Sequence, residues 1–271
     1  MGPALTSSLD HASRSVSLVG SLLAWATWAG VLTAVMVPRT VSLTALRTCV
    51  PLVAAGAGWA AVEGEAGPLD ALAVAWAALC VVSAFLPSTG EAFVDGSSYG
   101  DERRFPLRIP LALLAGPVQL AWLAAVSPAG GALLLAGQRW AAGGIVLVVG
   151  VAAARVALPA LHGLARRWVV FVPAGVVLHD PTSLAEAILF RRSEVLWLGP
   201  APLEEAGSAM DLTQRSLGLA LRLELAEPRQ VAPRPGRGAP VELVQTSRLI
   251  FTPTRPGAVV AEAERRGLPI G

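Results

Sequence analysis

Apolar residues dominate the first 165 positions, in long runs separated by short polar stretches. A helix of roughly 20 apolar residues is long enough to cross the hydrocarbon core of a bilayer, which is about 30 Å thick. The pattern predicts a polar leader over residues 1–15 and a transmembrane helical domain over residues 16–165. Its five predicted spans cover residues 16–37, 43–62, 69–86, 107–126 and 141–161. Residues 127–131 read as a helix break, and a short apolar patch over residues 132–136 follows it. A four-span alternative stays open, because the third span is short and because of this patch.

After residue 166 the apolar pattern changes to short alternating runs, which are typical of strands. Residues 168–172 and 176–179 form a predicted hairpin around a Pro-Ala-Gly turn, and residues 188–190 and 195–198 are two further strands. Five leucines alternate with other residues from Leu217 to Leu225, which predicts one buried strand face.

The end of the chain is predicted to contain a last hairpin and one helix. The hairpin would pair residues 241–245 with residues 248–252. The helix would have Thr254 as its N-cap, Pro256 in its first turn and Gly267 as its stop. Residues 166–271 are thus expected to form a small, mainly β domain closed by one C-terminal helix.

The composition agrees with a membrane protein. Hydrophobic residues make up 54% of the chain and charged residues 15%, whereas soluble domains carry roughly 25% charged residues. All 21 basic residues are arginine, and alanine, glycine and proline are abundant. This bias suggests GC-rich codons and therefore a bacterial source.

Arginines fall mainly on one side of the predicted spans, and the positive-inside rule places that side in the cytoplasm. The inner segments would carry Arg39, Arg47, Arg103, Arg104, Arg108, Arg166 and Arg167, and the outer segments only Arg14 and Arg139. We therefore expect a multi-pass protein of the bacterial cytoplasmic (inner) membrane, with its N-terminus outside and its C-terminal domain in the cytoplasm.

The C-terminal region resembles the bacterial pleckstrin-homology-like domains. The resemblance rests on the hairpin WVVFVPAGVVLHD, the strand pair around ILFRRSEVLWL and the closing strand and helix LIFTPTRPGAVVAEAERRG. It covers residues 168–267 and concerns the type and order of elements. It implies a bent barrel or two packed sheets with a helix over one end. Such domains act in binding, oligomerisation or membrane association, and the resemblance carries no catalytic residues.

Chemical motifs are scarce. The three histidines have no metal-ligand spacing, and the sequence has no nucleophile elbow, phosphate-binding loop or dinucleotide fingerprint. His179 and Asp180 could serve as a ligand or in acid–base chemistry, but a strand end and turn is the favoured explanation. We predict no catalytic residue, no metal and no cofactor. Nucleic-acid binding is not expected, because the basic residues are sparse and not interleaved with aromatics.

The inner loop over residues 88–105 is the strongest candidate for binding, since it is longer than most connections between bundle helices. Its candidate residues are Asp95, Tyr99, Asp101, Arg103 and Arg104. The alternative is a solvated loop whose arginines flank the membrane. Four further arginines are predicted to face lipid headgroups, because basic residues near an anionic surface are attracted to it. They are Arg166, Arg167, Arg191 and Arg192.

Two functions fit these patterns. The first is a non-enzymatic membrane protein that holds a pleckstrin-homology-like module at the inner membrane surface. Its partners would be the bilayer, anionic lipid headgroups, and either a second copy of the chain or another membrane protein. The second is a polytopic transporter or membrane enzyme with its site at the inner loop, regulated by the C-terminal domain. The nearly charge-free spans favour the first.

Overall fold

The computed structural model describes residues 13–63, 67–202, 209–235, 240 and 242–271. Contacts divide the chain into two compact units. The helical unit comprises Met1–Thr89 and Ala115–Leu161, and the β-unit comprises Gly90–Leu114 and His162–Gly271. The predicted boundary at residue 166 thus differs from the structure, in which part of the α4–α6 connection belongs with the C-terminal region. Most of the predicted leader lies outside the described residues.

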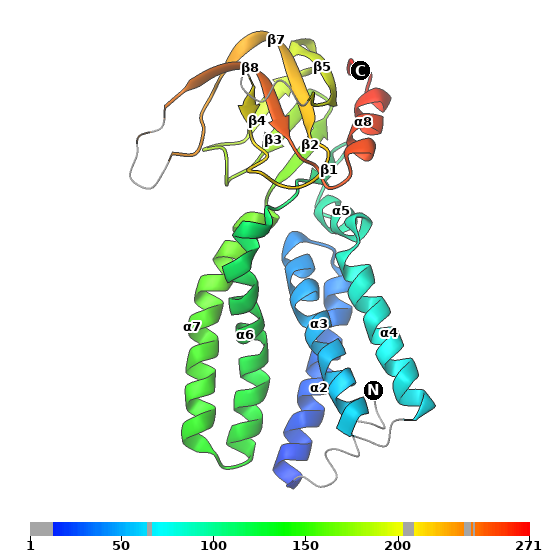
Figure 1. Cartoon of the computed structure of the whole chain (residues 1–271), viewed down its shortest axis with the longest axis vertical. Helices are drawn as coiled ribbons and strands as arrows, with labels where there is room; N and C mark the ends of the chain where they lie inside the picture. Colours follow the sequence, from blue (N-terminus) through cyan, green and yellow to red (C-terminus); the bar gives the residue numbers. More distant parts are fainter. Residues whose placement is uncertain (1–12, 64–66, 203–208, 236–239, 241) are drawn as a thin grey trace. The chain divides into compact units, whose positions relative to one another are not determined.

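Among the residues that the structure describes, five helices are long and apolar enough to cross a membrane, as the sequence predicts (Figure 1). They are α2 (Arg14–Met36), α3 (Thr40–Glu63), α4 (Pro68–Phe85), α6 (Leu111–Ala136) and α7 (Trp140–Ala165). The fourth begins at Leu111 rather than at residue 107, because the chain after β1 (Arg103–Pro106) stays extended: Leu107 forms a bridge with Pro253, and the N–H of Arg108 donates to the carbonyl oxygen of Thr252 at 2.7 Å.

The break predicted at residues 127–131 is wrong, because α6 runs through both Pro117 and Pro128. A proline frees the carbonyl four residues earlier and would end most helices in water. In apolar helices a serine hydroxyl can satisfy a nearby backbone group, so proline is tolerated. Pro128 frees the carbonyl of Ala124, and the Ser127 hydroxyl donates to the adjacent carbonyl oxygen, that of Leu123, at 2.6 Å.

Helices α6 and α7 approach each other closely at glycines. A Cβ atom added at Gly150 would lie 2.3 Å from Cβ of Ser127, and one at Gly131 would lie 2.6 Å from the side chain of Leu147. Gly56 and Gly58 have no neighbour within 4 Å of the added atom, so these two glycines make no such contact.

Replacing Gly150 with alanine is expected to destabilise the α6–α7 pair by about 1–3 kcal/mol, because the added methyl group overpacks the contact with Ser127. Thermal unfolding of the full chain in detergent would measure the effect. The matched control is Gly144→Ala in the same helix, where nothing lies within 4 Å of the added atom. That change should be neutral or stabilising by up to ~1 kcal/mol, since alanine favours helix. Equal effects at both positions would contradict the close contact.

The β-unit contains two four-stranded sheets. The first is antiparallel, in the order β1 (Arg103–Pro106), β2 (Trp168–Val172), β3 (Gly175–His179) and β4 (Ile188–Arg191). The second has the order β5 (Val195–Pro200), β7 (Leu221–Val231), β8 (Val244–Phe251) and β6 (Met210–Asp211), with β6 parallel to β8. A 3₁₀ turn, Arg192–Glu194, lies between β4 and β5.

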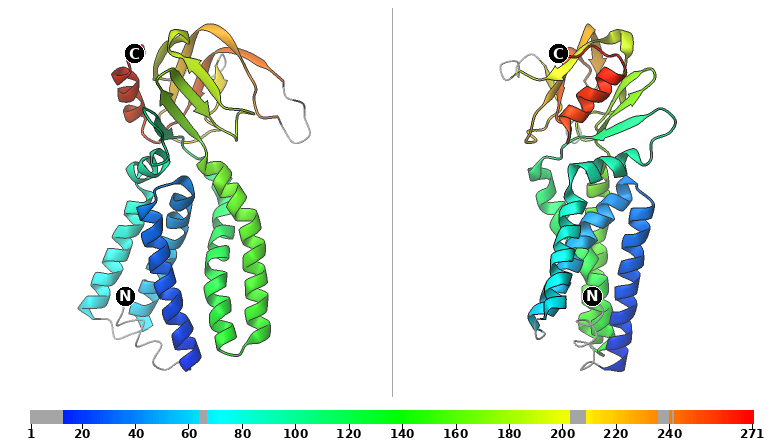
Figure 2. Two further views of the ribbon diagram at one scale, coloured as in Figure 1. Left: turned by 180° about the vertical axis from the view of Figure 1, so that it is seen from behind. Right: turned by 90° about the vertical axis from the view of Figure 1, so that its right-hand side faces the viewer.

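One hydrophobic core joins both sheets and the C-terminal helix α8 (Pro256–Arg265), which packs into it through Val259 and Ala263 (Figure 2). Phe105 of β1 and Phe171 of β2 meet there edge to face, with ring centroids 5.8 Å apart. The predicted hairpin of β2 and β3 and the predicted C-terminal helix are both confirmed. Gly267 ends that helix with φ of +68°, as expected for a C-terminal glycine.

Three details of the predicted C-terminal region are wrong. Residues 244–251 form the single strand β8, because β7 extends to Val231 and pairs with it along that length. The leucine-rich strand begins only at Leu221, so Leu217 and Leu219 are exposed. The N-cap of α8 is Arg255 rather than Thr254.

Candidate functional site

The predicted inner loop is a folded part of the β-unit. Helix α5 (Pro87–Asp95) begins it, and β1 pairs antiparallel with β2 in the register Phe105 to Val169. Buried Phe105 and Leu107 then fix the segment to the core. Strand pairing and packing therefore hold the loop in place, whereas a plain solvated loop would have neither.

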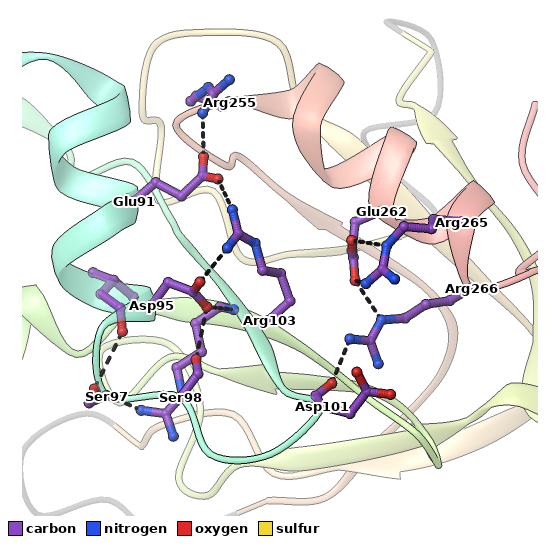
Figure 3. A network of polar contacts seen from close by, with 12 residues as sticks. Glu91, Asp95, Ser97, Ser98, Asp101, Arg103, Arg255, Glu262, Arg265 and Arg266 are labelled. Atoms are coloured by element: carbon purple, nitrogen blue, oxygen red, sulfur yellow. Dashed lines mark hydrogen bonds and ion pairs between the residues drawn. The ribbon is translucent and has the colours of Figure 1, made fainter.

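An ionic network covers α5 and β1 (Figure 3). Glu91 is buried and accepts hydrogen bonds from Arg103 at 3.0 Å and from Arg255 at 2.9 Å. Arg103 also pairs with Asp95, whose other oxygen accepts from the backbone N–H of Arg104 at 2.9 Å. These charges neutralise one another and tie α5 to β1 and to the start of α8.

A second cluster surrounds the C-terminal end of α8. Arg265 and Arg266 both donate to Glu262, and Arg266 also donates to the carbonyl oxygen of Asp101 at 2.6 Å (Figure 3). Burial raises the pKa of Glu262, but the two arginines outweigh burial and leave that pKa below its ordinary value of 4.5. Glu262 therefore stays ionised and holds both guanidinium groups in place.

A cavity of about 290 Å³ opens beside this cluster. Its lining includes three arginines and one carboxylate, which are Arg192, Arg265, Arg266 and Asp101. Guanidinium groups bind phosphate and carboxylate by paired hydrogen bonds. The chemistry that this cavity supports is the binding of a small anionic group, and it contains no general acid–base pair or nucleophile.

The five predicted inner-loop residues do not form one site. Asp95 and Arg103 belong to the ionic network, and Asp101 lines the cavity. Arg104 pairs with Glu102 and lies over the ring of Trp168 at 5.8 Å. Tyr99 is 88% exposed.

Of the four arginines predicted to face lipid headgroups, Arg166, Arg191 and Arg192 are exposed. The prediction for Arg167 is wrong, because its side chain is 1% exposed and pairs with Asp180, which is equally buried. Arg167 donates from Nε and Nη2 to the two oxygens of Asp180 at 2.9 and 2.8 Å. It also donates to the carbonyl oxygens of Arg108 at 3.0 Å and Leu212 at 3.3 Å. The residue joins three segments of the β-unit.

Asp180 is ionised in this pair. Burial raises its pKa, but hydrogen bonds and charge from Arg167, with hydrogen bonds from Thr182 and Ser183, bring the pKa below its ordinary value of 3.8. A lowered native pKa stabilises the fold above the unfolded-state value of roughly 3.9. That contribution is lost as the pH falls through the native pKa.

No hydrogen bond joins His179 to Asp180, both of whose side-chain oxygens accept from Arg167. The ring of His179 stacks on Trp168 with centroids 5.0 Å apart. Burial is the largest influence and lowers the pKa of His179 from 6.5, Arg166 and Arg104 lower it further, and Asp180 opposes them. The imidazole is therefore neutral near pH 7. No group of three His, Cys, Asp or Glu side chains suited to a metal ion occurs among the described residues.

Five charged residues of these clusters were not predicted from the sequence: Glu91, Arg255, Glu262, Arg265 and Arg266. Glu91 and Arg255 are 164 positions apart, and one sequence carries no sign of such a pair. Glu262 and Arg266 are spaced i and i+4 on a helix, a common ion-pair spacing that could have identified them.

Comparison of the chain with models of known protein families, with curated protein sequences and with solved structures gave no match.

Proposed function

We propose that this chain is a non-enzymatic integral membrane protein that holds a pleckstrin-homology-like module at the inner membrane surface. The module would serve lipid-surface binding or assembly with a protein partner. One observation carries the proposal: the β-unit is built from two separate segments of chain, residues 90–114 and 162–271. The chain therefore passes between the units three times, so three connections join them rather than one linker.

The pairing of β1 with β2 also supports the proposed topology. These strands are hydrogen-bonded, so residues 103–106 and 168–172 lie on the same side of any membrane. Between them are α6 and α7, which must both cross or both not cross. Since both are apolar and long enough, two crossings are favoured. Helices α2, α3 and α4 then make an odd number of crossings and put the start of α2 on the opposite side.

The pleckstrin-homology-like assignment is supported by the two small sheets and the closing helix. Two features depart from the expected pattern of consecutive antiparallel strands. Strand β1 comes from the connection between α4 and α6, and β6 pairs in parallel with β8. The first departure suits a module fixed at the membrane, because it adds attachments to the helices.

The transporter or enzyme alternative has less support. It requires polar groups of the inner loop and of α7 to converge on a substrate. Asp95 and Arg103 are instead occupied by each other and by Glu91. A transport site would leave such groups available to a substrate.

Single cysteines should reveal the proposed topology. The starting variant replaces Cys49 and Cys80, which are free thiols, with alanine. A Tyr99→Cys variant is then expected to react with a membrane-impermeant maleimide only after the cells are permeabilised. An Arg139→Cys variant, in the turn between α6 and α7, is expected to react in intact cells. Both positions are exposed, so a difference in labelling reports sidedness.

Labelling of Tyr99→Cys in intact cells would overturn the orientation. Labelling of both variants from the same side would overturn the two crossings by α6 and α7. Quantifying both after permeabilisation controls for expression and thiol reactivity.

A further inference from the structure

Two exposed leucines stand out in the loop over residues 212–220, between β6 and β7. Leu217 is 73% exposed and Leu219 is 53% exposed. Their alternation with Leu221, Leu223 and Leu225 predicted a common buried face, but only the last three are buried. Gly218 adopts φ of +128°, which turns the chain away from the strand.

The loop is ordered by several hydrogen bonds. The carbonyl oxygen of Leu212 accepts from buried Arg167 at 3.3 Å, and the N–H of Thr213 donates to Asp211 at 2.7 Å. The N–H of Ser216 donates to the carbonyl oxygen of Thr213 at 3.0 Å. Gln214 and Arg215 also have positive φ, of 51° and 60°. Residues in the left-handed conformation carry a conformational cost. The loop adopts this conformation although it leaves both leucines in solvent.

The loop lies at the end of the β-unit where the chain enters α6 and leaves α7. A Cβ atom added at Gly218 would be 2.8 Å from Nε of Arg108. The N–H of Leu107 donates to the carbonyl oxygen of Arg167 at 3.0 Å, so the chain segments leading to the two helices lie together. Helix α6 begins at Leu111, three residues after Arg108. Three residues span at most about 10 Å, so Arg108 and the loop beside it lie close to the start of α6.

We propose that Leu217 and Leu219 insert into the lipid at the membrane surface and anchor this end of the β-unit there. The inference rests on the proposed function, in which α6 crosses the bilayer and the β-unit lies at its surface. It adds a contact surface and names its partner, the boundary between headgroups and acyl chains.

Lipid fits this surface better than water does, because each leucine leaves apolar area exposed that burial would stabilise. The hydrocarbon core of a bilayer is about 30 Å thick, and the bilayer with its headgroups is about 40–45 Å thick. The headgroup region therefore adds several ångströms on each side. A loop close to the first residue of α6 is within that depth. Arg108, which precedes α6, and Arg215, which lies in the loop, are both exposed. They can reach lipid phosphates while the leucines enter the acyl region, as in other interfacial segments.

The test uses the full chain without Cys49 and Cys80, reconstituted in vesicles of phosphatidylethanolamine and phosphatidylglycerol. A single cysteine replaces Leu217 or Leu219 and carries a small environment-sensitive fluorophore. The matched control is Leu196→Cys on β5, which is 56% exposed. Leu196 lies four residues along β5 from Pro200, which pairs with Leu221 at the membrane end. At about 3.3 Å per residue that is roughly 13 Å farther from the loop.

Lipids brominated in the upper acyl chain are expected to quench the labels at Leu217 and Leu219 several-fold more than the label at Leu196. Iodide in the buffer should show the reverse order. Equal quenching by iodide at all three positions would overturn the proposal, and so would protection of Leu217 and Leu219 from both quenchers, which indicates a protein contact. The maleimide sidedness of Tyr99→Cys is measured separately, in cells. Correct sidedness without lipid quenching refutes the loop anchor alone, whereas wrong sidedness refutes the proposed function.

Discussion

Replacing Arg167 with methionine is expected to lower the free energy of unfolding of the β-unit by about 3–5 kcal/mol. Methionine fills a similar volume but leaves the buried carboxylate of Asp180 without its cation. It also removes the donors to the carbonyl oxygens of Arg108 and Leu212. Hydrogen exchange of the β2 and β7 amides, followed by mass spectrometry on the full chain in detergent, measures the loss directly.

The control for Arg167→Met is Arg166→Met, since the neighbouring side chain is exposed and should change stability by no more than about 0.5 kcal/mol. The double variant Arg167→Met, Asp180→Leu removes both charges and should recover much of the loss, because apolar replacements of a whole buried pair are often neutral. If Arg167→Met exchanges as slowly as the parent chain, the pair does not hold the β-unit together.

The apolar lengths of the five helices made them predictable from the sequence, because span length is set by bilayer thickness. The hairpin of β2 and β3 was predictable because its signal is local, with β-branched runs around a short turn. Strand β1 has only four residues, two of them arginines. It forms because β2, more than 60 positions later, offers a pairing edge, and such non-local pairing leaves no periodic signal.

The sequence contained a sign that Arg167 is buried, but the charge pattern favoured the opposite prediction. Side chains alternate along a strand, and Val169 and Phe171 of β2 are fully buried. Position 167 has the same parity and so continues the inward face. Two adjacent arginines at the end of an apolar span nevertheless favour a membrane flank. The candidate cavity was less accessible to prediction, since its lining comes from four separate parts of the chain.

Replacing Phe105 with alanine is expected to destabilise the β-unit by about 3–5 kcal/mol, as is usual for a large buried aromatic. The residue is 3% exposed and meets Phe171 edge to face. Since Phe105 is the buried aromatic of β1, its loss should first release β1 from β2. The amides of residues 103–106 should then exchange faster than those of β7, which a global loss of stability would not produce. The same hydrogen-exchange measurement in detergent resolves the two regions.

Two variants control for Phe105→Ala. Tyr99→Ala removes an aromatic from the same connection, but its ring is exposed, so stability should change by less than about 0.5 kcal/mol. Phe105→Leu keeps most of the buried volume and should cost less than about 1.5 kcal/mol. An unchanged exchange rate at β1 in Phe105→Ala would mean that the α4–α6 connection is held to the β-unit by its ionic network alone. The α4–α6 connection would then be fixed by Glu91 and Asp95 rather than by the core, and Glu91→Gln would release it.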